Sequence, residues 1–190
     1  MVKTASADNK LADAALKLLA KKSWRDLTLA DVAKTAKIPL AQLQDLRGGK
    51  PALLGLILKK IGAETARAYK PESDTARERL FDVALAWFEA NAKRKPAIGA
   101  LYEGLKYDPI TLISERNEFA AAAQWLMTIA EADSGPAVQA RALALAAIIA
   151  RAIPVWLKDD AEMAATMARL DGDLSRAHGF LKKRDVKPAA

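Results

Sequence analysis

The sequence predicts an all-α protein with about nine helices and no sheet. Apolar residues recur at intervals of three and four positions through every long segment, as they do on the buried face of an amphipathic helix. No segment shows the alternation of apolar and polar residues that marks a half-buried strand. Hydrophobic residues make up 52% of the 190 positions, so the chain can bury a core in one large or two small domains.

Short helices separated by turns are expected at the start of the chain. A helix should cover residues 8–22, after a loose arm at residues 1–6. A turn follows, whose Trp24 should pack under the next helix. That helix covers residues 28–36 and has Thr28 as its N-cap.

Residues 28–50 predict a helix-turn-helix. Pro39 interrupts the first helix and suits the first position of a second one. Gly48 and Gly49 then end the second helix, whose expected inward side chains are Leu40, Leu43 and Leu46. Two short helices joined by so brief a turn are typical of DNA-binding units that place the second helix in the major groove.

A longer helical series follows the helix-turn-helix. Residues 70–74 combine proline with capping residues, and we place the domain boundary there. We predict a helix-turn-helix DNA-binding domain over residues 1–50, with a connecting helix over 51–70, and a ligand-binding and dimerisation domain over 71–190. The helices expected in the second domain cover residues 75–93, 95–105, 109–129, 137–157 with a kink at Pro154, and 160–180, with a loop at 134–136 and a basic tail at 182–184.

The positive charge of the chain is concentrated at its beginning. Residues 1–70 hold 14 Lys and Arg against 6 Asp and Glu, a net charge of +8. The remaining residues hold 16 basic and 17 acidic side chains, a net charge of −1. This distribution is the electrostatic footprint of a nucleic-acid-binding module on a neutral body, although a solvated lysine-rich surface gives the same count.

Composition also bears on the compartment. The chain has no cysteine, which excludes disulfides and thiolate metal sites. Its first residues are polar and lack the apolar core of a secretory signal. The most apolar stretch, residues 142–150, is bracketed by arginines and is too short to span a bilayer, so we expect it to be a buried helix. A cytoplasmic protein is the expectation.

The order of a leading helix, a helix-turn-helix, a connecting helix and an all-helical body resembles the TetR family of bacterial transcriptional regulators. The resemblance covers roughly the first 65 residues. The residues that carry it are Ala14, Ala15, Trp24, Thr28, Val32, Ala33, Ala36, Ile38, Leu43, Lys50 and Leu53. It implies a homodimer that binds double-stranded DNA through its N-terminal domain and a small apolar ligand through its body.

The resemblance also implies which residues touch DNA. Gln42 and Gln44 would read adenine edges in the major groove, and basic side chains around them would hold the phosphate backbone. The full predicted set is Thr28, Lys34, Lys37, Gln42, Gln44, Arg47 and Lys50.

Several of these positions depart from the pattern of the family. The family usually has glycine at Lys37, serine or threonine at Pro39, tyrosine at Gln44 and phenylalanine at Arg47. The second helix contains no Lys or Arg, and its Asp45 would face the phosphates unfavourably. The spacing therefore supports the helix-turn-helix more strongly than its exposed chemistry supports DNA reading.

Aromatic and methionine side chains of the body are candidates for a ligand pocket between helices. The candidate residues are Trp87, Phe88, Tyr102, Tyr107, Phe119, Trp125, Met127 and Trp156. Each one taken alone is more often a core residue. For the twofold interface we expect the small residues of 142–150 and a stripe formed by Met163, Met167, Leu170 and Leu174.

An enzyme is not expected, and neither a cofactor nor a metal is predicted. The one histidine, His178, is interpreted as a surface or interface residue. Asp159 and Asp160 have no His or Cys nearby and suit a helix cap better than a metal site. Gly48 and Gly49 form a helix stop and not a phosphate-binding loop.

A second resemblance gives an alternative function. The segments Trp156-Leu157-x-Asp159-Asp160 and Thr166-Met167-x-x-Leu170-Asp171 resemble the C-terminal part of a lipid-binding family that assists ubiquinone biosynthesis. That family shares the TetR-like fold without binding DNA and contacts membranes peripherally through an amphipathic helix. The alternative is therefore an accessory protein that binds isoprenoid or acyl lipid.

Overall fold

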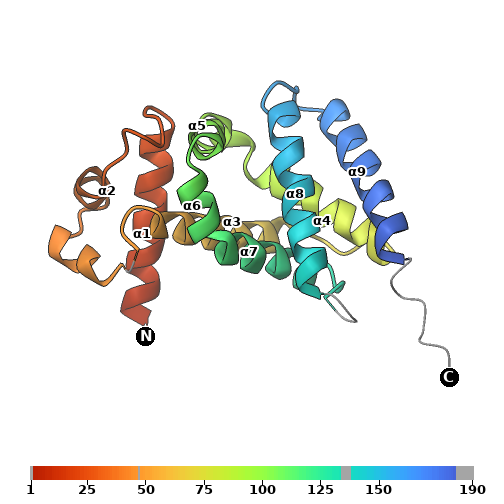
Figure 1. The fold of residues 1–190 in the computed structure, drawn as a ribbon, viewed down its shortest axis with the longest axis horizontal. Helices are drawn as coiled ribbons and strands as arrows, with labels where there is room; N and C mark the ends of the chain where they lie inside the picture. Colours follow the sequence, from red (N-terminus) through yellow and green to blue (C-terminus); the bar gives the residue numbers. More distant parts are fainter. Residues whose placement is uncertain (1, 47, 134–137, 183–190) are drawn as a thin grey trace. The chain divides into compact units, whose positions relative to one another are not determined.

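The computed structural model describes residues 2–46, 48–133 and 138–182, and its regular structure there is entirely helical (Figure 1). Nine α-helices and two 3₁₀ helices occur in these ranges, without a strand, which confirms the predicted all-α fold. The elements are α1 (Val2–Leu19), α2 (Leu29–Ala36), η1 (Leu40–Asp45), α3 (Ala52–Ala68), α4 (Ala76–Ala90), η2 (Ala92–Arg94), α5 (Lys95–Lys106), α6 (Pro109–Ser114), α7 (Arg116–Ile129), α8 (Val138–Trp156) and α9 (Ala164–Lys182). The loop predicted at 134–136 and the tail beyond residue 182 lie outside the described residues.

The chain divides into two compact units that do not follow sequence order. Unit 1 comprises Met1–Ala63 and Asn91–Phe119, and unit 2 comprises Glu64–Ala90 and Ala120–Ala190. Unit 1 therefore joins the helix-turn-helix region with α5 and α6, and unit 2 contains α4, α8, α9 and most of α7. The domains predicted at 1–50, with the helix 51–70, and at 71–190 group the chain differently and stay a prediction.

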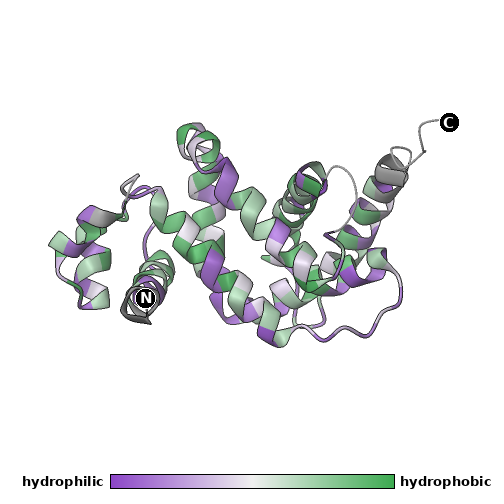
Figure 2. Cartoon of the chain, turned by 90° about the horizontal axis from the view of Figure 1, so that it is seen from below, coloured by the Kyte–Doolittle hydropathy of each residue, from purple (hydrophilic) through white to green (hydrophobic). Residues whose placement is uncertain are grey.

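Helix α1 supplies much of the buried face of unit 1. It packs on α2 and α5, and Leu11, Ala15 and Leu19 on its inner face are buried. The helix begins at Val2, so residues 2–6 are helical and not the predicted loose arm. No proline or glycine interrupts that segment, and the helix therefore continues through it. Figure 2 shows hydrophilic and hydrophobic residues sharing each helix, as amphipathic packing requires.

Trp24 lies in the turn after α1 and contacts α5. Its side chain is 2% exposed, and its Nε1 donates a hydrogen bond to Asp108 Oδ2 at 3.4 Å. A Cβ added to Gly104 of α5 would lie 2.2 Å from the Cβ of Trp24. Glycine at position 104 therefore lets the turn rest directly on α5, a partner that the sequence did not predict.

Unit 2 is centred on packed aromatic rings. The ring centroids of Trp87 and Phe88 are 4.9 Å apart, and that of Trp156 lies 6.2 Å from Trp87 and 5.3 Å from Phe88. All three side chains are buried. Helix α4 supplies Trp87 and Phe88, and α8 supplies Trp156. Helix α9 packs on both α8 and α4 in the same unit.

A buried carboxylate joins α8 to α9. Asp173 of α9 is 6% exposed, and its oxygens lie 3.3 Å from Arg151 Nε, 2.9 Å from Arg169 Nε and 2.5 Å from Arg176 Nη2. Three guanidinium groups therefore compensate the burial of one negative charge. Because Arg151 belongs to α8, the cluster fixes the register of the two helices.

Helix α8 is the one helix of the described ranges that is long and apolar enough to cross a membrane. It has 19 residues, more than the predicted apolar stretch 142–150. A core helix of a soluble protein passes the same test, so the finding is weak evidence for a span. Leu145, Ile148 and Ile149 are buried as predicted, whereas Leu143 is 50% exposed.

Candidate nucleic-acid interface

The start of α2 is fixed by local hydrogen bonds. Thr28 Oγ1 accepts a hydrogen bond from the backbone N–H of Asp31 at 3.1 Å, which confirms Thr28 as the N-cap. Lys22 Nζ lies 2.9 Å from Asp31 Oδ2. The hydrogen bond from Lys22, helped by Thr28, lowers the pKa of Asp31. The end of α1 is thereby tied to the first turn of α2.

The turn between the two helices has the hydrogen bonds of a Schellman motif. Lys37 takes a left-handed conformation with φ 56° and ψ 41°. Its N–H bonds to the carbonyl of Lys34 at 3.2 Å, and the N–H of Ile38 bonds to the carbonyl of Ala33 at 3.0 Å. Glycine adopts this left-handed conformation without the strain that a Cβ brings.

The second helix of the unit is a 3₁₀ helix, η1, and not the α-helix that the sequence predicted. It begins after Pro39, whose side chain supplies no capping hydrogen bond. Only eight residues separate this proline from the turn at Gly48 and Gly49, whose φ angles are 98° and 65°, and η1 takes six of them. So short and uncapped a segment favours the tighter i to i+3 bonding.

The leucines of η1 do not all point inward. Leu43 is buried at 4% exposure, and Leu46 is half-buried, as predicted. Leu40 is 55% exposed, so its predicted inward placement is wrong. It stands at the first position of η1. An apolar side chain at the start of this short helix is thus exposed to solvent.

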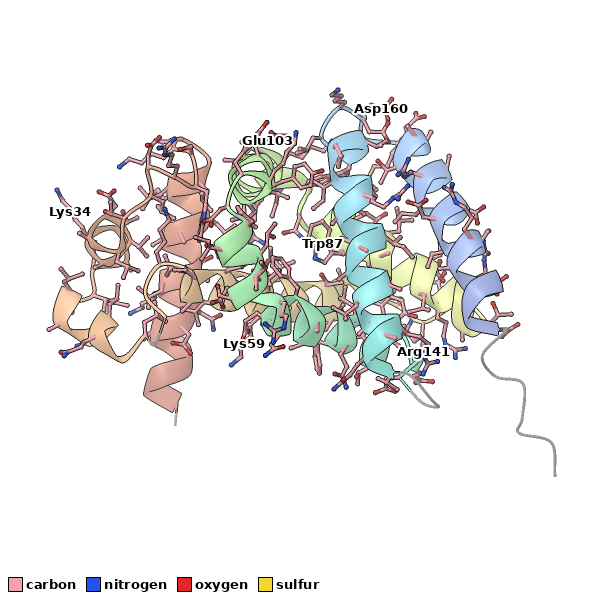
Figure 3. All side chains as sticks on the ribbon, viewed as in Figure 1. Lys34, Lys59, Trp87, Glu103, Arg141 and Asp160 are labelled. Atoms are coloured by element: carbon pink, nitrogen blue, oxygen red, sulfur yellow. The ribbon has the colours of Figure 1, made fainter. Side chains whose placement is uncertain are left out.

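The predicted DNA-contacting residues fall into three groups. Thr28, Lys34, Lys37, Gln42 and Gln44 are exposed, and Figure 3 shows Lys34 pointing outward from α2. All of these lie on α2, on η1 or beside them, so the structure brings them onto one helix-turn-helix. Arg47 lies outside the described residues, as does the side chain of Asp45.

Lys50 forms the third group, because its ammonium is turned toward the protein. Nζ donates a hydrogen bond to the backbone carbonyl of Arg25 at 3.1 Å and lies 4.9 Å from the ring centroid of Trp24. Burial lowers the pKa of Lys50, while the nearby carboxylates of Asp108 and Asp26 oppose that shift. Lys50 therefore stabilises the turn that carries Trp24.

The predicted pocket residues fall in both compact units. Trp87, Phe88 and Trp156 form the aromatic cluster of unit 2, and Met127 is buried in the same unit. Trp125, also in unit 2, is 47% exposed. Tyr102, Tyr107 and Phe119 belong to unit 1, where Tyr107 is 77% exposed. Among them, the rings of Trp87, Phe88 and Trp156 are shown to contact one another.

Asp159 and Asp160 cap the start of α9, as the sequence predicted. Asp159 Oδ2 accepts hydrogen bonds from the N–H and Oγ1 of Thr166, both at 2.7 Å. Asp160 Oδ1 accepts from the N–H of Glu162 and of Met163 at 3.0 and 3.2 Å. Within the described ranges, no group of three His, Cys, Asp or Glu side chains is placed to hold a metal ion. The side chain of His178 lies outside the described part of the chain.

Comparison with known proteins identifies the class of fold. A TetR transcriptional regulator from Rhodococcus sp. RHA1 superposes with a TM-score of 0.68 and 13% identity, over 92% of this chain and 96% of that one. The TetR transcriptional regulator of Nitrosomonas europaea ATCC 19718 gives a TM-score of 0.64 and 17% identity, over 90% and 98% of the two chains. No protein-family model matches the sequence, and no curated protein matches it.

A third similar structure is the TetR family repressor AlkX from Dietzia sp. strain DQ12-45-1b, which is implicated in biodegradation of n-alkanes. Its TM-score is 0.55 at 18% identity, over 92% of this chain and 94% of that one. All three similar proteins are TetR regulators matched over nearly their whole length. The chain therefore has the TetR-like fold that the sequence predicted.

Proposed function

We propose that the protein is a DNA-binding transcriptional regulator that acts as a homodimer. The observation that carries this proposal is the helix-turn-helix of α2 and η1, which holds the exposed side chains of Lys34, Lys37, Gln42 and Gln44. The TetR-like fold of the chain and the net charge of +8 over residues 1–70 support the same conclusion. The three similar solved structures are of TetR regulators, whose role is transcriptional regulation.

Each exposed side chain of the helix-turn-helix has a chemistry that suits B-DNA. Gln42 and Gln44 can bond to the N6 and N7 edge of adenine in the major groove. Leu40, which the sequence assigned to the core, can contact the methyl group of thymine. Lys34 and Lys37 would neutralise phosphates beside the groove. The expected operator is therefore rich in A·T pairs at the positions that η1 reads.

The proposed dimer uses the outer faces of α8 and α9. Ala140, Leu143, Ala147 and Ala150 form an exposed stripe at helical spacing on α8. On α9, Ala164, Ala165 and Ala168 are exposed. Of the predicted stripe of Met163, Met167, Leu170 and Leu174, Met167 is half-buried and the other three side chains are buried within the chain. Small side chains allow close helix packing, so the alanine faces suit a closed twofold interface.

A small apolar ligand in unit 2 is the proposed effector. Trp87, Phe88, Trp156 and Met127 offer an apolar, polarisable environment. The repressor AlkX, which has the same fold, is implicated in n-alkane biodegradation. A ligand that binds one conformation better shifts the protein toward it and so changes its affinity for DNA.

Fluorescence anisotropy with a palindromic duplex from upstream of the gene tests DNA binding. We expect specific binding to exceed that of a scrambled duplex by about 10³-fold or more, with affinity that falls steeply as salt rises. Gln42→Ala should cost about 1–3 kcal/mol on the specific duplex alone. Lys34→Ala should weaken binding to both duplexes and reduce the salt slope by about one. Gln124→Ala on α7 is the matched control, because Gln124 is an exposed glutamine outside the helix-turn-helix.

Two results would contradict the proposal. Equal affinity for the upstream and scrambled duplexes at low salt would remove the claim of sequence reading. Sedimentation of the wild type as a monomer, or an unchanged dimer in Leu143→Glu, would remove the claimed interface. If DNA binding fails and mass spectrometry of the purified protein finds isoprenoid or acyl lipid, the alternative lipid-binding function is favoured.

A further inference from the structure

Unit 1 contains a cleft beside the turn that carries Trp24, which we call the unit 1 cleft. It is bordered by the end of α1, by Lys50 and by α5, and its volume is about 1000 Å³. Every residue that lines it belongs to unit 1. It contains none of the aromatic cluster, so it is distinct from the effector site proposed above.

The cleft carries an excess of positive charge. Four basic side chains line it against two acidic ones, Glu103 and Asp108. Lys22 is neutralised by Asp31 at 2.9 Å. Lys21 and Arg25 form no ion pair or side-chain hydrogen bond with any other described residue. Two cations therefore face the cleft without a compensating carboxylate.

The remaining charged groups of the cleft also favour a negatively charged ligand. The carboxylate of Asp108 already accepts hydrogen bonds from the N–H and hydroxyl of Thr111, at 3.0 and 2.7 Å, and from Trp24. Glu103 lies 3.8 Å from Lys106. Lys50 donates one of its three protons to the carbonyl of Arg25, which leaves two for a ligand. The hydrogen-bonding capacity of Asp108 is thus largely used, Glu103 is an exposed side chain at the edge, and basic donors remain.

Apolar side chains form the rest of the lining. Leu19, Ala20, Pro96 and Ala100 contribute aliphatic surface, and Tyr107 stands beside them with 77% of its surface exposed. An aromatic ring left in water at the edge of a cleft gains free energy when a flat apolar group covers it. The combination of an apolar wall with unneutralised cations selects an amphipathic anion.

We propose that the unit 1 cleft binds a small aromatic carboxylate. Lys50 and Arg25 would hold the carboxylate, with Arg25 suited to two parallel hydrogen bonds, and the ring would lie against the apolar wall near Tyr107. Because the lining comes from both the turn of Trp24 and α5, the bound anion joins these two parts of unit 1. The proposal does not depend on DNA binding.

Isothermal titration calorimetry of the full chain with 1-naphthoate tests this site. We expect saturable binding with a Kd of about 10–500 μM. The uncharged analogue 1-naphthamide and inorganic phosphate should each bind at least about tenfold more weakly, because one lacks the charge and the other the ring. Arg25→Gln, which alters only an exposed side chain, and Lys50→Gln should each weaken naphthoate at least about tenfold. Lys17→Gln on the exposed face of α1 is the matched control and should bind as the wild type does.

Ala100→Phe fills the cleft without changing its charge and should abolish binding. Circular dichroism establishes that each variant is folded, and Arg25→Gln decides the test if Lys50→Gln unfolds. Absence of naphthoate binding up to about 5 mM would overturn the proposal. So would unchanged affinity in Arg25→Gln or in Ala100→Phe, which would place the ligand elsewhere. Phosphate binding as tight as naphthoate would mean simple charge attraction and would also refute it.

Discussion

Replacing Lys37 by glycine should stabilise the helix-turn-helix. Lys37 is held at φ 56° and ψ 41°, a conformation that costs a residue with a Cβ about 1–2 kcal/mol. Glycine avoids this strain, but it loses more backbone entropy on folding, by about 0.5–1 kcal/mol. The difference predicts a net gain of about 0.5–1 kcal/mol for Lys37→Gly. The two hydrogen bonds of the turn involve backbone atoms only and are retained.

Hydrogen exchange of the α2 amides and urea unfolding of the full chain measure this effect. Protection of the α2 amides in Lys37→Gly should rise by about two- to fivefold. Lys34→Gly is the matched control, because Lys34 is an exposed lysine inside α2 and its loss removes the same charge. Glycine in a helix interior should lower stability there by about 0.5–1 kcal/mol. If both variants change stability in the same direction, the charge and not the backbone conformation is responsible, and the reasoning is refuted.

Three further predictions concern packing and charge. Gly104→Ala should lower the free energy of unfolding by about 1–3 kcal/mol or more, because a Cβ there meets Trp24. Gly172→Ala should not destabilise the chain, because a Cβ there would lie 3.9 Å from Arg176 Nη2, an ordinary contact distance. Asp173→Ala should cost about 1.5–3 kcal/mol in urea unfolding, and an unchanged stability would refute its role as the link between α8 and α9. The hydrogen bonds from Thr111 lower the pKa of Asp108 in the folded chain. The ionised carboxylate therefore stabilises the folded chain at every pH above the pKa of an unfolded aspartate, about 3.9. This stabilisation is lost as the pH falls through the lower pKa of the folded chain. The stability difference between the wild type and Asp108→Asn should therefore shrink on acidification, and a difference that stays constant down to about pH 2 would contradict this.

Helical periodicity and capping residues were sufficient to predict most of the architecture. The all-α class, the N-cap at Thr28 and the cap at Asp159 followed from local rules that act within a few residues. The form of η1 did not follow, because the choice between α and 3₁₀ bonding depends on what a short segment can bond to at its ends. Leu40 illustrates the limit, since its apolar character predicts burial but not whether a neighbour covers it.

The site was harder to predict because it depends on contacts between distant segments. The aromatic residues were chosen by type, yet the fold places Tyr107 in unit 1 and Trp87 in unit 2. Likewise the basic character of Lys50 suggested a phosphate contact, whereas its position beside Trp24 assigns it to the turn and the cleft. Gly104 was a sequence signal that another residue packs closely on α5. A glycine in a helix does not reveal, however, which side chain makes that close contact.

The contact of Trp24 with α5 connects the helix-turn-helix region to a part of the chain that is remote in sequence. Trp24 lies between α1 and α2, and it contacts Gly104 of α5, Asp108 at the N-cap of α6 and Lys50 before α3. Thr28, which caps α2, follows this turn after three residues. Since α1, α2, η1 and α5 belong to one compact unit, we expect a ligand that binds against α5 to influence the helix-turn-helix through these contacts.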